Sequence, residues 1–323
     1  MSAASADDVL IHVDALTHRY GDVVAVDAIS FDVRRGEMFG LIGPDGAGKT
    51  TTLRIVLGLL RPAAGTVRTC GLEPRRQSAE LSQRIGYLSQ RFSLYGDLTV
   101  DENVAFFAGI HGVDDYRERR AETLDMLRMT PFRDRLAERL SGGMKQKLAL
   151  ACTLVHTPEL LVMDEPTTGV DPVSRRDFWR VLARLQREGL TLLLTTPYLD
   201  EAERCQRVAL MDGGRLLTVS APDALREQAQ GALVELIARP KRAAAEWLAA
   251  QPEVSDVQVF GERLHATLAR VPLAAAAAPV ERLAGGLRAA GVEVLSVRAM
   301  PPSLEDLFIA RVREAHGATR EVA

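Results

Sequence analysis

A glycine-rich segment of the chain has the composition of a loop that binds phosphate groups. Glycines let the backbone curl so that several N–H groups point at one anion. Its lysine can reach the β- and γ-phosphates of a nucleotide, and its first threonine can hold Mg²⁺. The segment fits the pattern G-x-x-x-x-G-K-[ST], which carries weight where a strand precedes it and a helix follows. Its residues are Gly43, Pro44, Asp45, Gly46, Ala47, Gly48, Lys49, Thr50 and Thr51.

Two adjacent acids, Asp164 and Glu165, follow the apolar run LLVM. Ligands of open α/β sheets bind at the carboxyl ends of strands, which is where these acids are expected. Asp164 suits an outer-shell role on magnesium through water, and Glu165 suits a general base that polarises an attacking water. Together with the phosphate loop, this pair predicts hydrolysis of a nucleotide, with Lys49 and Glu165 as catalytic residues.

A second anion site is predicted at Ser141, Gly142 and Gly143. Ser141 is expected to cap the helix 142–156, and its hydroxyl would join the two glycine amides at the positive end of that helix. The sequence thus predicts two phosphate-binding sites in one chain.

The elements that must position these residues alternate between strands and helices. Near-continuous apolar runs at 38–43, 160–164 and 190–196 indicate strands buried on both faces of a parallel sheet. Helices are expected at 49–60, 100–110, 116–129, 142–156 and 173–188. The alternation favours an α/β fold. A hairpin is expected at 208–219, where Asp212-Gly213 separates two apolar runs, and it would end the first domain.

The chain from residue 231 onward has a different pattern of expected strands and helices. Strands are expected at 232–238, 254–260, 263–269 and 292–297, and helices at 241–250 and 279–290. The order β-α-β-β-α-β suggests a ferredoxin-like unit. The run Ala274–Ala278 lies between prolines and is expected to be a loop.

Composition narrows the class of protein. The chain has 323 residues, is 47% hydrophobic and carries a net charge of −3, which suits about two globular domains and lacks the basic excess of a nucleic-acid binder. Three cysteines without a CxxC pair favour a reducing compartment. No stretch approaches the roughly 18 uncharged apolar residues of a membrane span, and the acidic start lacks a secretory signal. We therefore expect a cytoplasmic protein with a frayed tail at 1–7.

The segment LSGGMKQ, placed between the phosphate loop and the Asp164-Glu165 strand, resembles the signature of the ATP-binding cassette (ABC) family. The resemblance extends over residues 9–225. It implies a P-loop NTPase fold with a parallel-sheet core, an antiparallel β subdomain and a helical signature subdomain. We accordingly expect an ABC ATPase domain at 8–230 and a small α+β accessory domain at 231–323.

The resemblance also implies roles for three further residues. Tyr20 is similar to the aromatic residue that stacks on adenine, and Gln90 to the Q-loop glutamine that touches Mg²⁺ and senses the transporter subunit. Asp171 resembles the D-loop acid that crosses a dimer interface. In this family two cassettes pack head to tail, so ATP lies between the phosphate loop of one chain and the Ser141 segment of the other.

Segments 94–112 and 301–309 resemble those of bacterial drug-exporter cassettes, whose membrane partner is usually a separate subunit of the ABC-2 type. The resemblance implies an ATPase at the cytoplasmic face of the bacterial inner membrane that powers efflux of drugs or other hydrophobic compounds. Residues 90–112 would then receive the membrane subunit.

Two residues depart from the family pattern. Pro197 stands where the family usually has a histidine, so neither a side-chain donor nor a backbone N–H is present. Asp45 replaces the usual asparagine of the phosphate loop and places a carboxylate near ATP.

Two other functions compete with the transporter ATPase. A soluble cassette protein of translation or DNA repair usually carries two cassettes or a long coiled coil, and this chain has neither. A regulatory switch that binds ATP, dimerises and turns over poorly is favoured by Pro197 and opposed by Glu165. The LSGGMKQ segment and the lack of an N-K-x-D motif exclude a small GTPase.

Overall fold

The computed structural model describes residues 8–91, 93–228, 231–269 and 271–320, and the expected tail at 1–7 lies outside them. The chain divides into two compact units, the first ending at Ala221 and the second beginning at Pro222. Each unit has its own cluster of buried apolar side chains. The sequence places the domain boundary after residue 230, so the second unit also contains the short helix that precedes this point.

A six-stranded sheet forms the centre of the first unit. Its strand order is β5-β6-β7-β3-β8-β9, with β9 antiparallel and every other neighbouring pair parallel. The predicted strands 38–43, 160–164 and 190–196 are confirmed as β3, β6 and β7, which are buried along their whole length. The strands are β3 (Met38–Ile42), β5 (Ile85–Leu88), β6 (Leu160–Asp164), β7 (Thr191–Thr196), β8 (Arg207–Asp212) and β9 (Arg215–Ser220).

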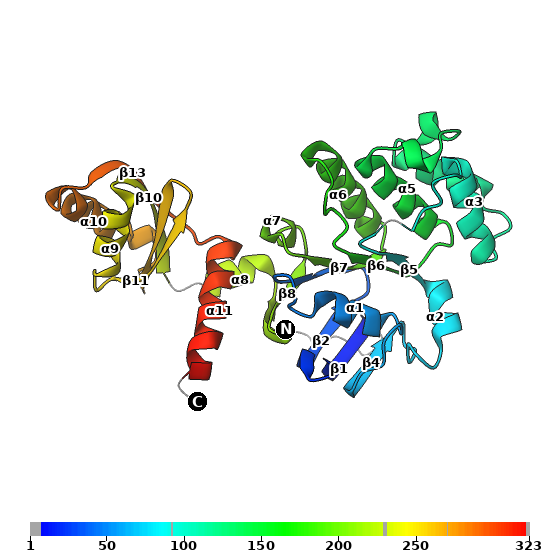
Figure 1. Cartoon of the computed structure of the whole chain (residues 1–323), viewed down its shortest axis with the longest axis horizontal. Coiled ribbons are helices and arrows are strands. Elements are labelled where there is room, and N and C mark those ends of the chain that lie inside the picture. Colours follow the sequence, from blue (N-terminus) through cyan, green and yellow to red (C-terminus); the bar gives the residue numbers. More distant parts are fainter. Residues whose placement is uncertain (1–7, 92, 229–230, 270, 321–323) are drawn as a thin grey trace. The chain divides into compact units, whose positions relative to one another are not determined.

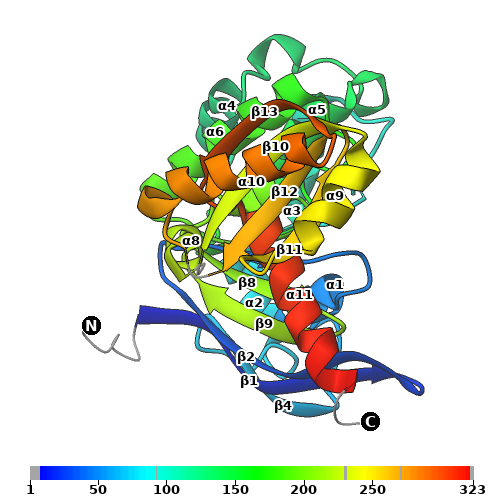
Figure 2. The ribbon, with the colours of Figure 1, turned by 90° about the vertical axis from the view of Figure 1, so that its left-hand side faces the viewer.

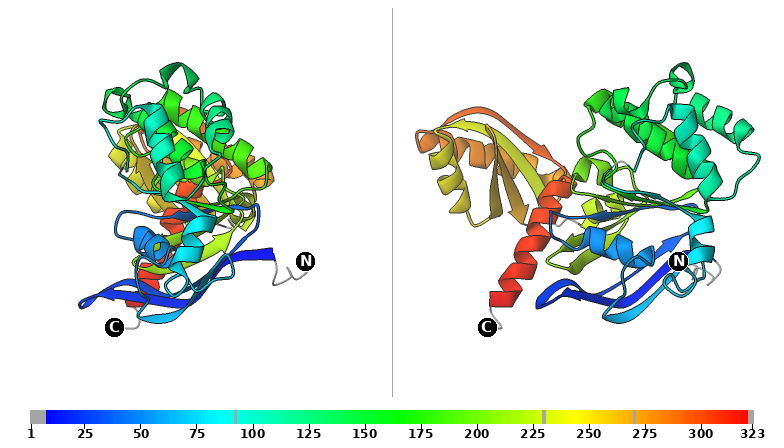
Figure 3. Two further views of the ribbon diagram at one scale, coloured as in Figure 1. Left: turned by 90° about the vertical axis from the view of Figure 1, so that its right-hand side faces the viewer. Right: turned by 45° about the vertical axis from the view of Figure 1, so that its right-hand side comes forward.

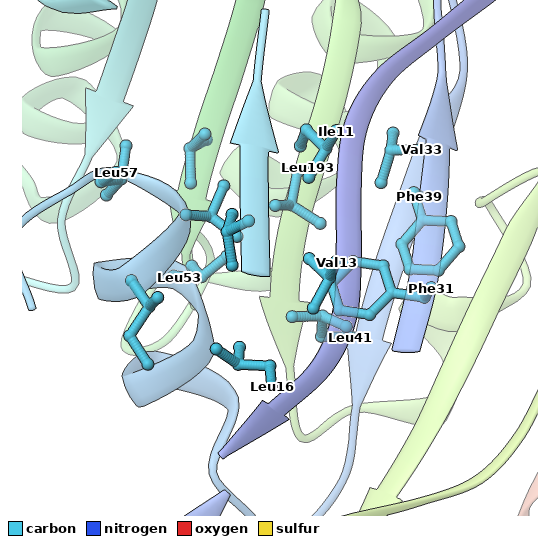
Figure 4. Packing of buried hydrophobic residues seen from close by; sticks show 14 of the residues in the cluster. Ile11, Val13, Leu16, Phe31, Val33, Phe39, Leu41, Leu53, Leu57 and Leu193 are labelled. Carbon is cyan, nitrogen blue, oxygen red and sulfur yellow. The ribbon is translucent and has the colours of Figure 1, made fainter. Parts of the chain in front are cut away.

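A second, antiparallel sheet has the order β2-β1-β4. Its strands are β1 (Val9–Tyr20), β2 (Val23–Arg34) and β4 (Ala64–Thr69). Helix α1 (Lys49–Val56) lies between the two sheets (Figure 1). Leu53 of α1 packs with Val13 and Phe31 of the antiparallel sheet and with Phe39 and Leu41 of β3, and all five side chains are buried (Figure 4). This apolar layer fixes the start of α1 against the end of β3.

The remaining helices of the first unit include a separate helical group, which Figure 3 shows away from the antiparallel sheet. The group comprises α3 (Val100–Ile110), α4 (Arg117–Met126) and α5 (Gly142–Leu154). A capping box fixes the start of α3, because Thr99 accepts from the Glu102 amide and Glu102 accepts from the Thr99 amide. The other helices are α2 (Ser78–Arg84), α6 (Pro172–Arg187) and α7 (Leu199–Ala202). These layers confirm the ABC-type fold expected from the resemblance.

The second unit contains an antiparallel sheet of order β11-β12-β10-β13. Helices α9 and α10 cover one face of it (Figure 2). This arrangement confirms the predicted β-α-β-β-α-β unit. Its elements are α8 (Pro222–Gln228), β10 (Gly231–Arg239), α9 (Lys241–Ala249), β11 (Val254–Phe260), β12 (Arg263–Ala269), α10 (Ala277–Ala289), β13 (Glu293–Met300) and α11 (Leu304–Arg320).

The expectation of a loop at Ala274–Ala278 is wrong. Residues Leu273–Ala275 form a 3₁₀ turn, Ala277 begins α10, and Ala276 is fully buried. Pro279 falls in the first turn of α10, where backbone N–H groups have no acceptor within the helix, so the proline does not interrupt it.

Among the described residues, no helix combines the length and the low charge that crossing a membrane requires.

Candidate active site

An open cavity of about 340 Å³ lies at the junction of β3 and α1. It is lined by the predicted loop from Asp45 to Thr51 together with Ala25, Gln90 and Glu165. The lining therefore unites residues from four separate stretches of the sequence. Two of them, Gln90 and Glu165, come from the ends of the neighbouring strands β5 and β6.

Two glycines of the loop have no space for a side chain. Gly48 has a φ of +98°, and a Cβ there would lie 2.4 Å from the carbonyl oxygen of Ala25. A Cβ on Gly43 would lie 2.2 Å from the carbonyl oxygen of Met211. The close approach of β2 and β8 thus requires glycine at both ends of the loop.

Lys49 is the cation of the cavity. Its side chain is 4% exposed, and its Nζ donates to the carbonyl oxygens of Gly43 at 2.8 Å and Pro44 at 3.0 Å. The same nitrogen lies 3.6 Å from Oε1 of Glu165. Lys49 is thus held by oxygens of the loop, and a phosphate group would replace weak partners with a fully charged one.

The two acids at the end of β6 have different surroundings. Asp164 is buried, and its Oδ1 accepts from the hydroxyls of Thr50 at 3.0 Å and Thr195 at 2.7 Å. Glu165 lies in the cavity, where its Oε2 accepts from the Gln90 amide at 2.9 Å and the Thr168 hydroxyl at 3.3 Å. Asp164 is therefore a fixed anchor for Thr50, and Glu165 faces the space that a reacting group would occupy.

Glu165 also has an unusual backbone. Its φ is +48°, in the left-handed region that costs a non-glycine residue about 1–2 kcal/mol. Its N–H donates to the Thr195 hydroxyl at 2.9 Å, which holds this conformation. The strained backbone turns the carboxylate out of the sheet and into the cavity.

Magnesium suits the donor set of this cavity. Thr50 and Gln90 line the cavity and offer a hydroxyl and an amide oxygen, and the buried Asp164, which is bonded to Thr50, offers a carboxylate. Such oxygen ligands are those that Mg²⁺ prefers. No group of three or more His, Cys, Asp or Glu side chains suited to a metal occurs in the described part of the chain. The set therefore fits an ion whose coordination is completed by phosphate oxygens and water, as is usual for Mg²⁺.

The predicted second anion site does not join this cavity. Ser141 caps α5 as predicted, accepting from the Met144 amide at 3.3 Å, and Gly142 and Gly143 form the first turn. None of the three lines the cavity. A nucleotide bound to the phosphate loop therefore does not contact them through the lining of its own chain.

Asp171 and Tyr20 lie outside the cavity as well. Asp171 is exposed and caps α6, accepting from the amides of Val173 at 3.1 Å and Ser174 at 2.9 Å. Hydrogen bonds from Ser174 and then Val173 lower the pKa of its carboxyl. Tyr20, at the β1–β2 hairpin, is 48% exposed and lies edge-on to the His18 ring, with 4.7 Å between centroids.

The two departures from the family pattern lie at the ends of strands. Pro197 follows the last residue of β7 and is half-buried, and the Thr196 hydroxyl accepts from the Tyr198 amide across it at 3.0 Å. Asp45 is exposed in the lining of the cavity. Position 197 offers no donor to a ligand, whereas Asp45 adds a negative charge at the cavity mouth.

Three residues of the site are not predicted from the sequence. The Thr195 hydroxyl donates to the Asp164 carboxylate and accepts from the Glu165 backbone N–H, because β6 and β7 run parallel with Asp164 opposite Thr195. A threonine ending a buried strand beside the acidic strand is the signal that could have indicated it. Thr168, three residues after Glu165, and Ala25, which contributes a backbone carbonyl, carry no comparable signal.

Comparisons with known proteins agree with this geometry. Residues 26–168 match the family described as ABC transporter. The probable multidrug ABC transporter ATP-binding protein YbhF of Escherichia coli (strain K12) is 40% identical over 223 residues, which are 68% of this chain and 39% of that protein. The Nod factor export ATP-binding protein I of Sinorhizobium fredii (strain NBRC 101917 / NGR234) is 36% identical over 94% of this chain and 86% of its own.

A solved structure described as the ATP binding subunit of an ABC transporter has the same fold. Its TM-score is 0.62 at 29% identity, over 68% of this chain and 92% of that chain. This chain spans about two fifths of YbhF but most of the Nod factor export protein. The chain therefore belongs to the family of ABC transporter ATP-binding proteins, the ATPases of ABC transporters.

Proposed function

We propose that this chain hydrolyses ATP in an export system and powers a separate membrane-spanning subunit. The observation that carries the proposal is the meeting of Lys49, Gln90 and Glu165 at one cavity that is lined by the phosphate loop. The names of the relatives, which are a multidrug and a Nod factor export protein, support export as the process. Efflux of drugs or other hydrophobic compounds is the finer form of the proposal.

The residues divide the chemistry between them. Lys49 and the amides of the loop bind the β- and γ-phosphates of ATP. Thr50 and Gln90 would hold magnesium, with Asp164 acting through water, and the ion would supply positive charge to the phosphate oxygens. Glu165 orients an attacking water and accepts its proton. The Thr195 hydroxyl fixes the Asp164 carboxylate and the Glu165 backbone.

A second copy of the cassette, or a different cassette, would complete the site. Ser141, Gly142 and Gly143 offer a hydroxyl and two amides at the start of α5, and they do not line the cavity of their own chain. A phosphate held by Lys49 of one chain would meet this second device on the other. Asp171, exposed at the start of α6, is proposed to cross the interface, and Tyr20 to stack on adenine.

The proposed place for the membrane subunit to bind lies beside β5. An apolar cavity of about 340 Å³ is lined by residues of α3, α5 and the end of α1, among them Leu59, Tyr87 and Phe107. Leu59 is 60% exposed and lines this cavity, so it offers apolar surface to a partner. This cavity adjoins the segment 90–112, and we propose that a helix of the membrane subunit fills it at the cytoplasmic face of the inner membrane.

Steady-state hydrolysis by the purified full chain tests the enzymatic part. Lys49→Ala should abolish ATP binding, because it removes most of the charge that faces the phosphates. Glu165→Gln should retain binding and lose turnover by about a hundredfold or more, as expected for a general base. Calorimetric binding equal in wild type and Lys49→Ala would contradict the assignment of the phosphate loop.

Co-purification from membranes tests the partner. The full chain should retain a membrane-spanning subunit, and Leu59→Asp should release it while ATP hydrolysis by the isolated chain persists. Retention of the partner by Leu59→Asp would exclude this cavity as the docking site.

Pro197 favours a second candidate function, a nucleotide-binding cassette of low turnover that regulates a partner. Without a donor at position 197, the γ-phosphate loses one hydrogen bond, and loss of such a donor costs about 3–4 kcal/mol in the transition state. Turnover that stays negligible after assembly with the membrane subunit would select this function.

A further inference from the structure

The side chain of Glu201 is the centre of a buried group of hydrogen bonds that the proposed reaction does not use. Its side chain is 1% exposed, and its Oε1 accepts from Arg175 Nε at 2.7 Å, from Trp179 Nε1 at 3.2 Å and from the Thr167 hydroxyl. We call Thr167, Arg175, Trp179, Asp200 and Glu201 the Glu201 cluster. It joins α6 and α7 to the segment after β6.

Arg175 extends the cluster to the turn at Pro197. Its NH2 group donates to both carboxylate oxygens of Asp200 at 2.9 Å. Its guanidinium carbon lies 4.8 Å from the centroid of the Tyr198 ring, close enough for a cation–π contact. Tyr198 is bonded across Pro197 to the Thr196 hydroxyl. The turn is thus fixed from both sides, by Thr196 within β7 and by Arg175 from α6.

The same cluster reaches the other two functional segments. Thr167 lies two residues after Glu165, and its neighbour Thr168 donates to the Glu165 carboxylate. Arg175 lies one turn after Asp171 in α6 and donates its N–H to the Asp171 carbonyl at 2.9 Å. Glu165, Asp171 and Pro197 are therefore linked through a single buried carboxylate.

Stability alone is a weak reason for this arrangement. A buried ion pair replaced by apolar side chains of similar volume is often as stable as before, whereas removal of one partner leaves a costly unpaired charge. The Oε2 atom of Glu201 has no hydrogen-bond partner in the described part of the chain, so its charge depends on Arg175. Unlike apolar packing, the ion pair fixes the orientation of the groups around it, because three donors converge on one Glu201 oxygen.

We propose that Arg175 and Glu201 are positioning residues for ATP hydrolysis, which hold Glu165, the start of α6 and the turn at Pro197 in one geometry. The inference rests on the proposed ATPase function and names residues beyond it. Neither residue lines the nucleotide cavity. Because the cluster links the Glu165 segment to α6 and to the Pro197 turn, a displacement of that segment on nucleotide binding would reach both.

Steady-state kinetics of three full-length variants test the positioning role. They are Glu201→Gln, Arg175→Met and the double variant Arg175→Met/Glu201→Gln. Arg175→Met should lower the melting temperature because it leaves the Glu201 charge unpaired, and the double variant should recover it. All three should lower kcat about tenfold or more and leave the KM for MgATP within about threefold, because misplaced groups impair the transition state more than binding.

The matched control is an exposed ion pair on the same helix. Arg184 donates to Glu188 at 2.8 Å, and both side chains are more than half exposed. The double variant Arg184→Met/Glu188→Gln removes the same charges and should keep kcat within about twofold. Recovery of kcat together with the melting temperature in Arg175→Met/Glu201→Gln would overturn the proposal, since a merely structural cluster predicts that result.

Fluorescence of Trp179 provides a test that needs no hydrolysis and leaves the Glu201 cluster intact. Trp179 is buried and bonded to Glu201, and the chain has one other tryptophan, Trp247. In a Trp247→Phe background, MgATP should change the emission of Trp179, and Lys49→Ala should abolish the change. MgATP binding without a change in emission would contradict the coupling. A change in emission without any turnover would instead contradict the proposed function and support the coupling.

Discussion

At the scale of a single residue, we expect Pro197 to limit how fast this cassette turns over. The site retains Lys49, Gln90 and Glu165 around the phosphate loop, so the parts needed for binding and for water activation are present. A proline at the end of β7 supplies neither a side-chain donor nor an N–H. The missing hydrogen bond matters chiefly in the transition state, where the γ-phosphate carries its charge in a new arrangement.

Pro197→His should raise kcat by about a hundredfold or more with little change in the KM for MgATP, since an imidazole can bond to the γ-phosphate and orient water. Steady-state hydrolysis by the full chain and by its complex with the membrane subunit gives the measurement. If the wild type already turns over at the rate of histidine-bearing relatives and Pro197→His slows it, another residue has taken the role. Pro197→Ala is the control, because it restores the backbone N–H alone.

Local sequence predicts the residues of the phosphate loop well, because a contiguous motif carries most of the chemistry. Gly43 to Gly48 connect β3 to α1, and Lys49 to Thr51 begin α1, so the motif is one continuous stretch. Thr195 contacts Glu165 from a distant part of the sequence, and Thr168 contacts it because the chain turns at Glu165. The parallel register of β6 and β7 and the left-handed backbone of Glu165 create these contacts, and no local sequence pattern predicts either feature.

At the scale of elements, the start of α5 is confined by α6. A Cβ on Gly143 would lie 2.4 Å from both Cβ and Oγ of Ser174, whereas a Cβ on Gly142 would have 3.8 Å to its nearest neighbour. Gly143→Ala should therefore destabilise the first unit by about 1–3 kcal/mol, the usual cost of overpacking. Thermal unfolding should show a lower transition for Gly143→Ala and little change for Gly142→Ala. Equal transitions would mean that α5 and α6 yield at this contact.

Two stacked histidines link the ends of α3 and α5. The rings of His111 and His156 lie 3.8 Å apart at an angle of 3°, and His156 bonds to the carbonyl of Ile85 at 2.9 Å. Burial lowers the pKa of both imidazoles below the usual 6.5, and for His156 the neighbouring His111 lowers it further. The folded state thus prefers the neutral forms.

Stability conferred by this pair is complete above pH 6.5 and is lost as the pH falls, because the unfolded chain then binds protons that the folded chain resists. The double variant His111→Gln/His156→Gln should lose less stability between pH 7 and pH 5 than the wild type does. Urea unfolding of the full chain at several pH values measures the difference. An unchanged slope of the unfolding free energy against pH would rule out the pair as its source.

Strands buried on both faces can be predicted from the sequence because a near-continuous apolar run is compatible with few other structures. Strands β3, β6 and β7 are of this kind, and all were predicted. The run Ala274–Ala278 misled because flanking prolines suggest a loop, whereas tertiary burial of Ala276 favours a 3₁₀ turn that leads into α10. A run of small, uncharged residues shows no hydrophobic periodicity, so tertiary packing decides its secondary structure.

At the scale of the whole molecule, two separate cores predict two separate stabilities. Leu283 is 1% exposed in the core of the second unit, together with Val234 and Leu248. Leu283→Ala should destabilise that unit by about 2–5 kcal/mol. Calorimetry should then show one lowered transition and one unchanged transition, with ATP binding retained. A shift of both transitions by the same amount would mean that the two units unfold together.

The placement of Ser141, Gly142 and Gly143 outside the cavity of their own chain has a consequence for reaction order. If two chains must meet before either site is complete, the rate per chain rises with chain concentration and falls on dilution, by mass action. Hydrolysis by the free protein should therefore be second order in protein at low concentration and first order once pairs saturate. Two chains held side by side on one membrane subunit have a high effective concentration, so the assembled exporter should escape this dependence. A specific activity that is constant from nanomolar to micromolar free chain would show that one chain suffices.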